Sequence, residues 1–218
     1  MWIQYWGWYV PLSRRWTVAA RRSEKSAETE HALKAAARRL FAERGYLNTK
    51  ITDITAAAGR AAGSFYNHFA SKEELLQALL KDLADESDTS SEDPAHSADF
   101  TDPESVRFHV ASYWAFARKN WPVLRAVQQA ALVNDDFARI AARFGTEQRD
   151  EVADHLDGFA PAGLRLPGPA DASLAMMFLS ASGLLQAVEE GGLTLTDAEA
   201  VDALTRFVYR GLTGRDID

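Results

Sequence analysis

The stretch GRAAGSFYNHFASKEEL, residues 59–75, holds two glycines, three aromatic rings, a histidine, two serines and a lysine, yet it keeps a helical period. At 100° per residue, one side of a helix over residues 61–69 is mostly aromatic and the other side is small or polar. The first side comprises Ala62, Phe65, Tyr66 and Phe69, and the second comprises Gly63, Ser64, Asn67 and His68. This division predicts a helix that is anchored on one side and leaves the other free to meet a partner.

Two further helices are predicted ahead of this segment. Apolar residues recur at helical spacing over 33–41, which indicates a helix that starts near 26–30 and stops at Gly45. A second, shorter helix is expected over 49–58, and Gly59 ends it. Because only a tight turn separates this helix from the next, the pair has the layout of a helix-turn-helix, whose second helix enters the DNA major groove.

The serine at the end of the stretch predicts where the following helix begins. Ser71 is followed three residues later by Glu74, which is a capping box, so a longer helix is expected over 71–85. Phe65 and Phe69 are too apolar to face DNA and are predicted to anchor the reading helix on its inner side. Their expected neighbours are Ile54, Leu40 and Phe41.

The outer residues suit DNA contact in two ways. A tyrosine at the border of the apolar face, Tyr66, can pack its ring and offer its hydroxyl to a phosphate. Lys72 and the free amides at the start of the next helix offer a second phosphate site. Charge agrees, because residues 1–82 contain 13 Lys and Arg against 8 Asp and Glu, whereas residues 83–218 contain 11 against 23. A basic N-terminal part is therefore joined to an acidic remainder.

The sequence ITDITAAAGRAAGSFYNHFASKEELL, residues 51–76, preceded by AAARRLFAERGYLNTK, resembles the DNA-binding signature of the tetracycline-repressor (TetR) family of bacterial regulators. The resemblance covers about residues 28–80 and implies an all-helical homodimer, with two heads in successive major grooves of a palindromic operator and a C-terminal domain that binds a small inducer. The DNA contacts that it implies are Thr49, Lys50, Thr52, Arg60, Ala62, Gly63, Ser64, Tyr66, Asn67, His68 and Lys72. The sequence departs from the family pattern at two places. Ala61 stands where Ser or Thr usually caps the reading helix, and Arg60 replaces a residue that is commonly apolar.

The predicted organisation is all-α, with a three-helix DNA-binding domain and a larger C-terminal helical domain. Its parts are an aromatic and basic extension at 1–25, read either as poorly ordered or as an arm for interaction, a helix-turn-helix domain at 26–70, a connecting helix at 71–85 and a ligand-binding and dimerisation domain at 86–218. Helices within the last part are expected near 103–119, 122–133, 135–156, 170–190 and 197–213. The acidic segment from residue 86 to 103 reads as a loop.

Two C-terminal helices carry apolar stripes that predict a dimer interface. The helix near 170–190 has a second apolar stripe opposite the first, formed by Met176, Leu179 and Gly183, so it is expected to lie between its own core and a partner. The predicted interface comprises Leu174, Met177, Phe178, Ala181, Leu185, Val201, Leu204 and Val208, and the alternative is that both helices are simply interior.

An apolar ligand pocket is expected among the aromatic residues of the C-terminal part. Its predicted lining is His109, Tyr113, Trp114, Trp121, Gln128, Phe144 and Met177, although aromatic residues at helical spacing also suit an ordinary core. No metal site and no cofactor are expected, because the five histidines (His31, His68, His96, His109 and His155) lack metal-ligand spacing.

Composition and motifs exclude several other classes. Cysteine is absent, so disulfides and thiolate sites are excluded. No apolar run reaches the ~18 residues of a membrane span, and the arginines of the N-terminal segment follow its apolar part, which is the wrong order for a signal peptide. A cytoplasmic location is therefore expected. No Gly-rich phosphate loop, Gly-x-Ser-x-Gly elbow or carboxylate pair supports an enzyme.

The predicted function is a homodimeric repressor that a small apolar molecule releases from its DNA operator. Two alternatives remain. One is an activator or nucleoid-type DNA binder without an inducer, and the other is a small-molecule-binding protein or enzyme with a vestigial helix-turn-helix. Salt-dependent, sequence-selective DNA binding separates them.

Overall fold

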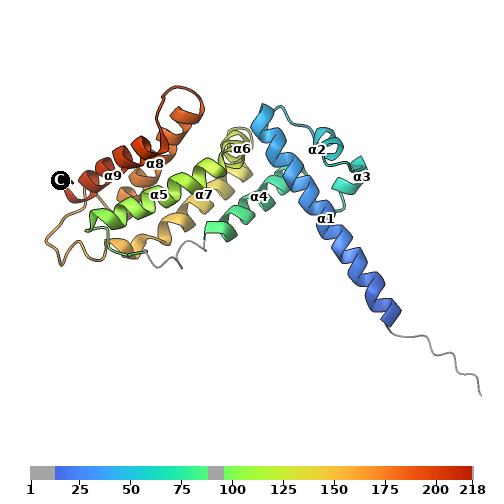
Figure 1. Cartoon of the computed structure of the whole chain (residues 1–218), viewed down its shortest axis with the longest axis horizontal. Coiled ribbons are helices and arrows are strands. Elements are labelled where there is room, and N and C mark those ends of the chain that lie inside the picture. Colours follow the sequence, from blue (N-terminus) through green and yellow to red (C-terminus); the bar gives the residue numbers. More distant parts are fainter. Residues whose placement is uncertain (1–12, 88–95, 218) are drawn as a thin grey trace, which may run out of the picture.

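The computed structural model describes residues 13–87 and 96–217, and its secondary-structure elements in these ranges are all helices (Figure 1). The N-terminal helices are α1 (Ser13–Arg44), α2 (Ile51–Ala57), α3 (Ala62–Phe65) and α4 (Lys72–Ser87). The C-terminal elements are α5 (Pro103–Lys119), α6 (Trp121–Ala131), α7 (Asp135–Asp150), the 3-10 helix η2 (Ala153–Leu156), α8 (Ala170–Glu189) and α9 (Asp197–Thr213). The predicted all-α class is confirmed, and below we call residues 26–70 the head and residues 96–217 the body.

Helix α1 is longer than the sequence analysis predicted. It begins at Ser13 rather than near 26–30, so residues 13–25 of the expected N-terminal extension are helical, and this part projects from the body in Figure 1. Those residues lack an apolar stripe, which is why the periodicity missed them. Residues 1–12 lie outside the described residues. Helix α1 ends as predicted at Gly45, whose φ of 78° favours glycine.

One hydrophobic core joins the head to the body. The buried side chains of α1 to α4 pack in a single cluster with residues of α6 and with Phe137 of α7. The α6 members of this cluster are Val123, Ala126, Val127 and Ala130. The head therefore has no separate core, and its orientation is tied to α6.

A second core fills the body between α5, α8 and α9. Phe100, Trp114 and Tyr209 are among its largest members, and each is at most 5% exposed. Helix ends are set by local signals. The Asp102 side chain accepts from the Glu104 amide at the start of α5, and Thr196 and Glu199 form a capping box at the start of α9.

Helix α8 is apolar on more than its core side. It is long and apolar enough to cross a membrane by length and composition, a feature that the sequence analysis did not expect because serines and a glutamine interrupt the apolar run. Only 22% of its most apolar window is buried within the chain. Met176 and Leu179 are exposed on it, as is Phe207 on the neighbouring α9. The body thus exposes an apolar face along α8 and α9.

Candidate DNA-binding surface and ligand pocket

The helix-turn-helix geometry is formed by α2, a tight turn and α3. Gly59 has a φ of 63° in this turn, so a glycine is needed there. Helix α3 is shorter than the predicted 61–69 and gives way to turns after Phe65. Ala61 provides no side-chain cap, as expected, and a glycine within α3 lowers its helix propensity.

The inner side of α3 is anchored as predicted. Phe65 is fully buried and Phe69 is 4% exposed, with their ring centroids 5.6 Å apart. They lie in the same buried cluster as Ile54, Leu40 and Phe41. This packing fixes which side of α3 faces outward.

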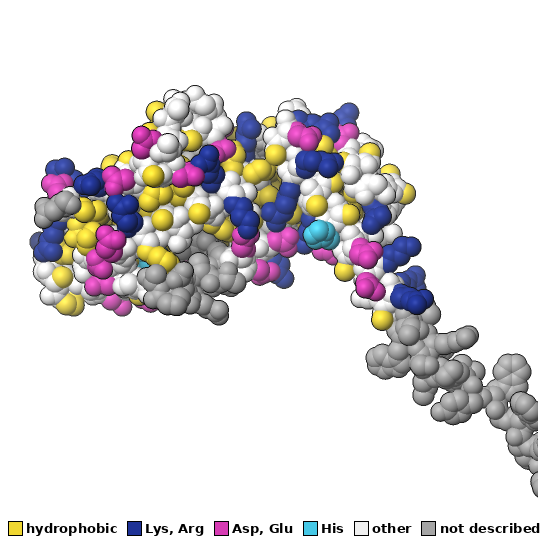
Figure 2. Space-filling view, in the orientation of Figure 1, with side chains coloured by type: hydrophobic (Ala, Val, Ile, Leu, Met, Phe, Trp, Pro, Cys, Tyr) yellow, Lys and Arg dark blue, Asp and Glu magenta, His cyan; other side chains and the backbone are white. Residues whose placement is uncertain are grey.

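The outer side exposes most of the residues predicted to contact DNA. Those exposed to solvent are Lys50, Thr52, Arg60, Ala62, Gly63, Tyr66 and Asn67. Gly63 is informative, because a Cβ built on it would meet nothing within 4 Å and its φ is not positive. Neither packing nor backbone geometry within the chain requires a glycine there. Lys and Arg side chains lie over the head, interspersed with acidic ones, in the right half of Figure 2.

Four predicted DNA contacts are not fully exposed, namely Thr49, Ser64, His68 and, at the start of α4, Lys72. Thr49 is 1% exposed, and its hydroxyl donates to the Gly45 carbonyl at 2.8 Å. The His68 side chain is 10% exposed and turns toward α1, where its Nδ1 lies 4.0 Å from Glu30 Oε2. Ser64 is half-buried and donates to a backbone carbonyl of its own helix. Of Thr49, Ser64 and His68, only Ser64 lies in a helix as predicted, because Thr49 precedes α2 and His68 follows α3. Periodicity also could not show which side chains bond to the chain itself.

Lys72, the first residue of α4, is a structural residue that holds the head rather than a free cation. Its ammonium donates to the carbonyls of Tyr46 and Thr49 at 2.8 and 2.9 Å and lies 3.9 Å from the centre of the Tyr46 ring. Burial lowers the pKa of Lys72. The Tyr46 hydroxyl donates to Glu73 at 2.7 Å, and burial together with this carboxylate raises the pKa of Tyr46. These contacts hold the turn between α1 and α2 on the start of α4.

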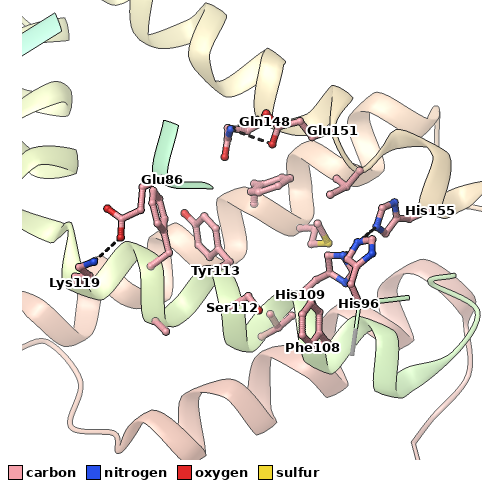
Figure 3. Close-up of a pocket in the computed structure, with 17 residues that line it drawn as sticks. Glu86, His96, Phe108, His109, Ser112, Tyr113, Lys119, Gln148, Glu151 and His155 are labelled. Atoms are coloured by element: carbon pink, nitrogen blue, oxygen red, sulfur yellow. Dashed lines mark hydrogen bonds and ion pairs between the residues drawn. The ribbon is translucent and has the colours of Figure 1, made fainter. Parts of the chain in front are cut away.

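A pocket of about 620 Å³ lies in the body and reaches the end of α4 (Figure 3). Its volume is in the range of small-molecule sites. The Glu86–Lys119 ion pair lies at one end and a group of histidines at the other, with Tyr113 between them. The lining is predominantly apolar and aromatic, and it includes Phe108, Tyr113, Phe116, Met177 and Phe178.

Three of the seven predicted ligand residues line this pocket, namely His109, Tyr113 and Met177. The other four are not among the lining residues. Trp114 is 2% exposed and donates to Asp197 at 2.8 Å, and Trp121 packs in the second core. Phe144 packs against the first core, and Gln128 is exposed on α6. The sequence analysis identified the aromatic helices but not which of their faces meet at the cavity.

The pocket also brings together histidines that the sequence separates. His96, His109 and His155 meet at one end, although they are far apart along the chain. Burial lowers the pKa of His109 to about 4. The hydrogen bond from His155 holds the pKa of the Asp154 carboxyl below its usual value. No sequence spacing signals this group, because the three side chains meet only through the fold.

The predicted dimer residues divide into two groups. Leu174, Ala181, Leu185, Leu204 and Val208 are each at most 5% exposed, so they fill the core of the body and cannot meet a partner. Met177, Phe178 and Val201 are half-buried. The outward stripe of α8 is the other one, which contains Met176 and Leu179. The sequence showed two stripes but not which of them is inside.

The fold and its outer α3 face define a helix-turn-helix protein with a helical C-terminal body. Residues 33–79 match the family model described as "Bacterial regulatory proteins, tetR family". The match covers most of the head, so the helix-turn-helix of this chain is of the TetR type.

The curated relative matches only a short segment of this chain, whereas the solved structures match its fold over most of its length. The transcriptional repressor KstR2 of Mycobacterium tuberculosis (strain H37Rv) is 50% identical over 46 residues, which are 21% of this chain and 23% of KstR2. The matched segment thus spans about a quarter of the curated relative. A TetR family transcription regulator from Marinobacter aquaeolei VT8 has the same fold, with a TM-score of 0.63, 21% identity and coverage of 89% of this chain and 100% of that one. A regulator from Saccharomonospora viridis, solved in complex with choline, has a TM-score of 0.69, 20% identity and coverage of 87% and 100%.

Replacing Lys72 with methionine is expected to destabilise the head, because two carbonyls lose their donor. The free energy of unfolding should fall by ~1–3 kcal/mol, measured by urea denaturation. Lys81→Met, at an exposed position of the same helix, is the control and should leave stability unchanged. If the Lys72→Met variant instead has normal stability but reduced DNA affinity, Lys72 is a phosphate contact, as first predicted.

Replacing Gly63 with alanine is expected to leave the fold intact and to weaken DNA binding. The free energy of unfolding should stay level or rise by less than about 1 kcal/mol, since the methyl group meets no atom of the chain. DNA affinity should fall about tenfold or more, equivalent to ~1.4 kcal/mol, because the methyl group stands between the backbone and the groove. Gly145→Ala in α7, where the added methyl makes only an ordinary contact, serves as the control. Unchanged affinity for Gly63→Ala would remove this part of α3 from the interface.

Proposed function

We propose that the chain is a homodimeric repressor that a small molecule releases from a palindromic operator. The observation that carries this proposal is the outer face of α3, which is small where a groove would approach the backbone and polar beside it, on a helix fixed by Phe65 and Phe69. The repressor role is supported by the name of KstR2, whose similarity is confined to the head. A cytoplasmic location, which access to DNA requires, belongs to the same proposal.

The DNA contacts that we propose are the exposed members of the predicted set. Arg60 and Lys50 supply charge for phosphates, and Tyr66, 61% exposed, offers its hydroxyl beside them. Asn67 has the amide donors and acceptor that base edges require. Two heads about one helical turn apart, ~34–36 Å, would read two half-sites.

The proposed route from ligand to DNA runs through α4 and α6. Glu86, near the end of α4, pairs with Lys119 at one end of the pocket. Arg38 of α1 donates to Asn120, the residue between α5 and α6, at 3.3 Å. The Tyr46 amide, beside the head turn, donates to Gln129 of α6 at 2.8 Å. A ligand that shifts α5 or α6 would therefore change the position of the head.

We infer that the effector is a small, largely apolar molecule. The aromatic lining of the pocket and its volume support this class. The choline complex of the Saccharomonospora viridis regulator indicates that a protein of this fold holds a small molecule. Choline itself is not implied for this chain.

We propose that two copies associate through the outer faces of α8 and α9. Leu179 is 68% exposed and Phe207 is 67% exposed, and Met176 adds to the same stripe of α8 as Leu179. Exposed apolar surface of this kind on a helix otherwise packed on its own core favours a partner helix. The interface proposed here replaces the buried members of the predicted set.

Selection of bound sequences from a random double-stranded DNA pool tests the function. We expect a palindrome, with affinity that falls steeply as salt rises, because phosphate contacts release counterions. Tyr66→Phe should weaken binding to every sequence by a similar factor, whereas Asn67→Ala should change preference at particular base pairs. Enrichment without any effect of small molecules would favour an inducer-independent binder. Absence of DNA binding at any salt would favour the vestigial alternative.

Replacing Phe207 with glutamate is expected to shift the chain from dimer to monomer in analytical ultracentrifugation, because a charge would be buried in the apolar interface. The control is Leu132→Glu, since Leu132 is 83% exposed between α6 and α7, away from the proposed interface. Dimers that persist in Phe207→Glu at low protein concentration would place the interface on another surface.

A further inference from the structure

Three histidine side chains converge from separate elements at one end of the pocket. His96 precedes α5, His109 lies on α5 and His155 lies on η2 (Figure 3). His155 Nε2 lies 3.2 Å from His96 Nε2 and 3.0 Å from His109 Nε2. One ring nitrogen from each residue lies within 4.8 Å of the other two. Nitrogen ligands ~2.0–2.1 Å from a tetrahedral zinc ion are about 3.3–3.4 Å apart, so two edges of the group are close to this spacing.

The outer partners of two rings fix where their hydrogens lie. His109 Nδ1 is 2.8 Å from the Ser105 carbonyl oxygen, which can only accept, so this nitrogen donates. His155 Nδ1 donates to the Asp154 carboxylate at 2.7 Å. In the neutral rings, each Nε2 then turns a lone pair toward the other ring. Two facing lone pairs at 3.0 Å are unfavourable, so either a proton or a metal ion must lie between the two nitrogens.

This arrangement matches the outer partners of metal-binding histidines. Such rings characteristically donate their second nitrogen to a carboxylate or a backbone carbonyl, which orients the ring and raises its basicity. His109 has a carbonyl partner and His155 has a carboxylate partner. The carboxylate would also offset part of the charge of an ion.

The segment that carries His96 is held in place by other elements. The Ser105 hydroxyl donates to the Ser97 carbonyl, and the Phe100 amide donates to the His155 carbonyl at 3.0 Å. The Phe100 ring is fully buried, with its centroid 4.9 Å from the His109 ring and 5.0 Å from the His155 ring. The three imidazoles therefore sit on a packed wall rather than on a free loop.

We propose that His96, His109 and His155 bind one divalent transition-metal ion of the zinc class and leave a coordination position open toward the pocket. Imidazole nitrogens suit Zn²⁺, Cu²⁺ and Ni²⁺, whereas Mg²⁺ and Ca²⁺ prefer oxygen ligands. Sites with three protein ligands keep a further position for water or a small molecule. An effector with a carboxylate or another anionic oxygen would bind the ion there, while its apolar part lies against the aromatic lining. This role of the ion rests on the proposed function, but the metal site itself does not.

The test is titration of the metal-free full-length chain with Zn²⁺ by calorimetry, and with Co²⁺ by visible absorption, both without DNA. We expect one ion per chain for the wild type and for the control His31→Ala, which changes an exposed histidine outside the group. His109→Ala and His96→Ala should lose measurable binding. Asp154→Asn should weaken binding ~10–100-fold, because the charged partner of His155 is removed.

Two outcomes would overturn the proposal: absence of binding to the wild type, and undiminished binding to folded His96→Ala and His109→Ala. Circular dichroism checks the fold of each variant. If His109→Ala does not fold, the His96→Ala variant, at a half-buried position, and the Co²⁺ spectrum of the wild type decide whether the site exists. Since no DNA is present, failure of the metal site and failure of operator binding are separate results. A shift of DNA affinity by Zn²⁺ in the wild type but not in His96→Ala would connect the two.

Discussion

The buried leucine face of α4 is the constraint on which the rest of the structure depends. Leu75, Leu76, Leu79, Leu80 and Leu83 are each at most 4% exposed and lie in one cluster with α1 and α6. Complete burial of one such side chain contributes ~1.5–3 kcal/mol, so five of them are large beside a total stability of ~5–15 kcal/mol. The head cannot separate from α4 and α6 without exposing this core and losing much of the folding free energy. It can therefore move only together with α4, or by the small amount that its contacts with α6 permit.

Polar contacts at the edges of this shared core set the position of the head relative to α4 and α6. Lys72 holds the turn after α1 on the start of α4, and Gln129 binds the Tyr46 amide from α6. Arg38 reaches Asn120 at the start of α6. Coupling between a ligand and DNA is typically ~1–3 kcal/mol, which is comparable to one or two such hydrogen bonds. Under the proposed function, a small shift of α6 would be sufficient for regulation, and the shared core would not have to open.

The sequence predicted the features that depend on neighbouring residues. The turn at Gly59, the anchor residues Phe65 and Phe69 and the cap at Ser71 are local signals, and the structure has each of them. The capping box is incomplete, because the Glu74 carboxylate accepts from the Ala70 amide instead of the Ser71 amide. The sequence could not predict contacts between distant segments. Lys72 has the same sequence context whether it faces a phosphate or the Tyr46 ring, and His96 and His155 meet only because η2 folds back beside α5. For α8, periodicity revealed two apolar stripes, but only the packing of α5 and α9 shows which one is interior.

The two ends of the pocket are built from different contacts, and one of them adjoins α4. The histidine end is walled by Phe100 and held by backbone hydrogen bonds. At the other end, the Glu86–Lys119 pair joins side chains that are 37% and 69% exposed, and exposed pairs typically contribute only ~0–1 kcal/mol. Under the proposed function, a ligand that fills the pocket would reach the histidine group at one end and Glu86 at the other. Because Glu86 lies near the end of α4, a displacement there would act on the helix that packs against the head.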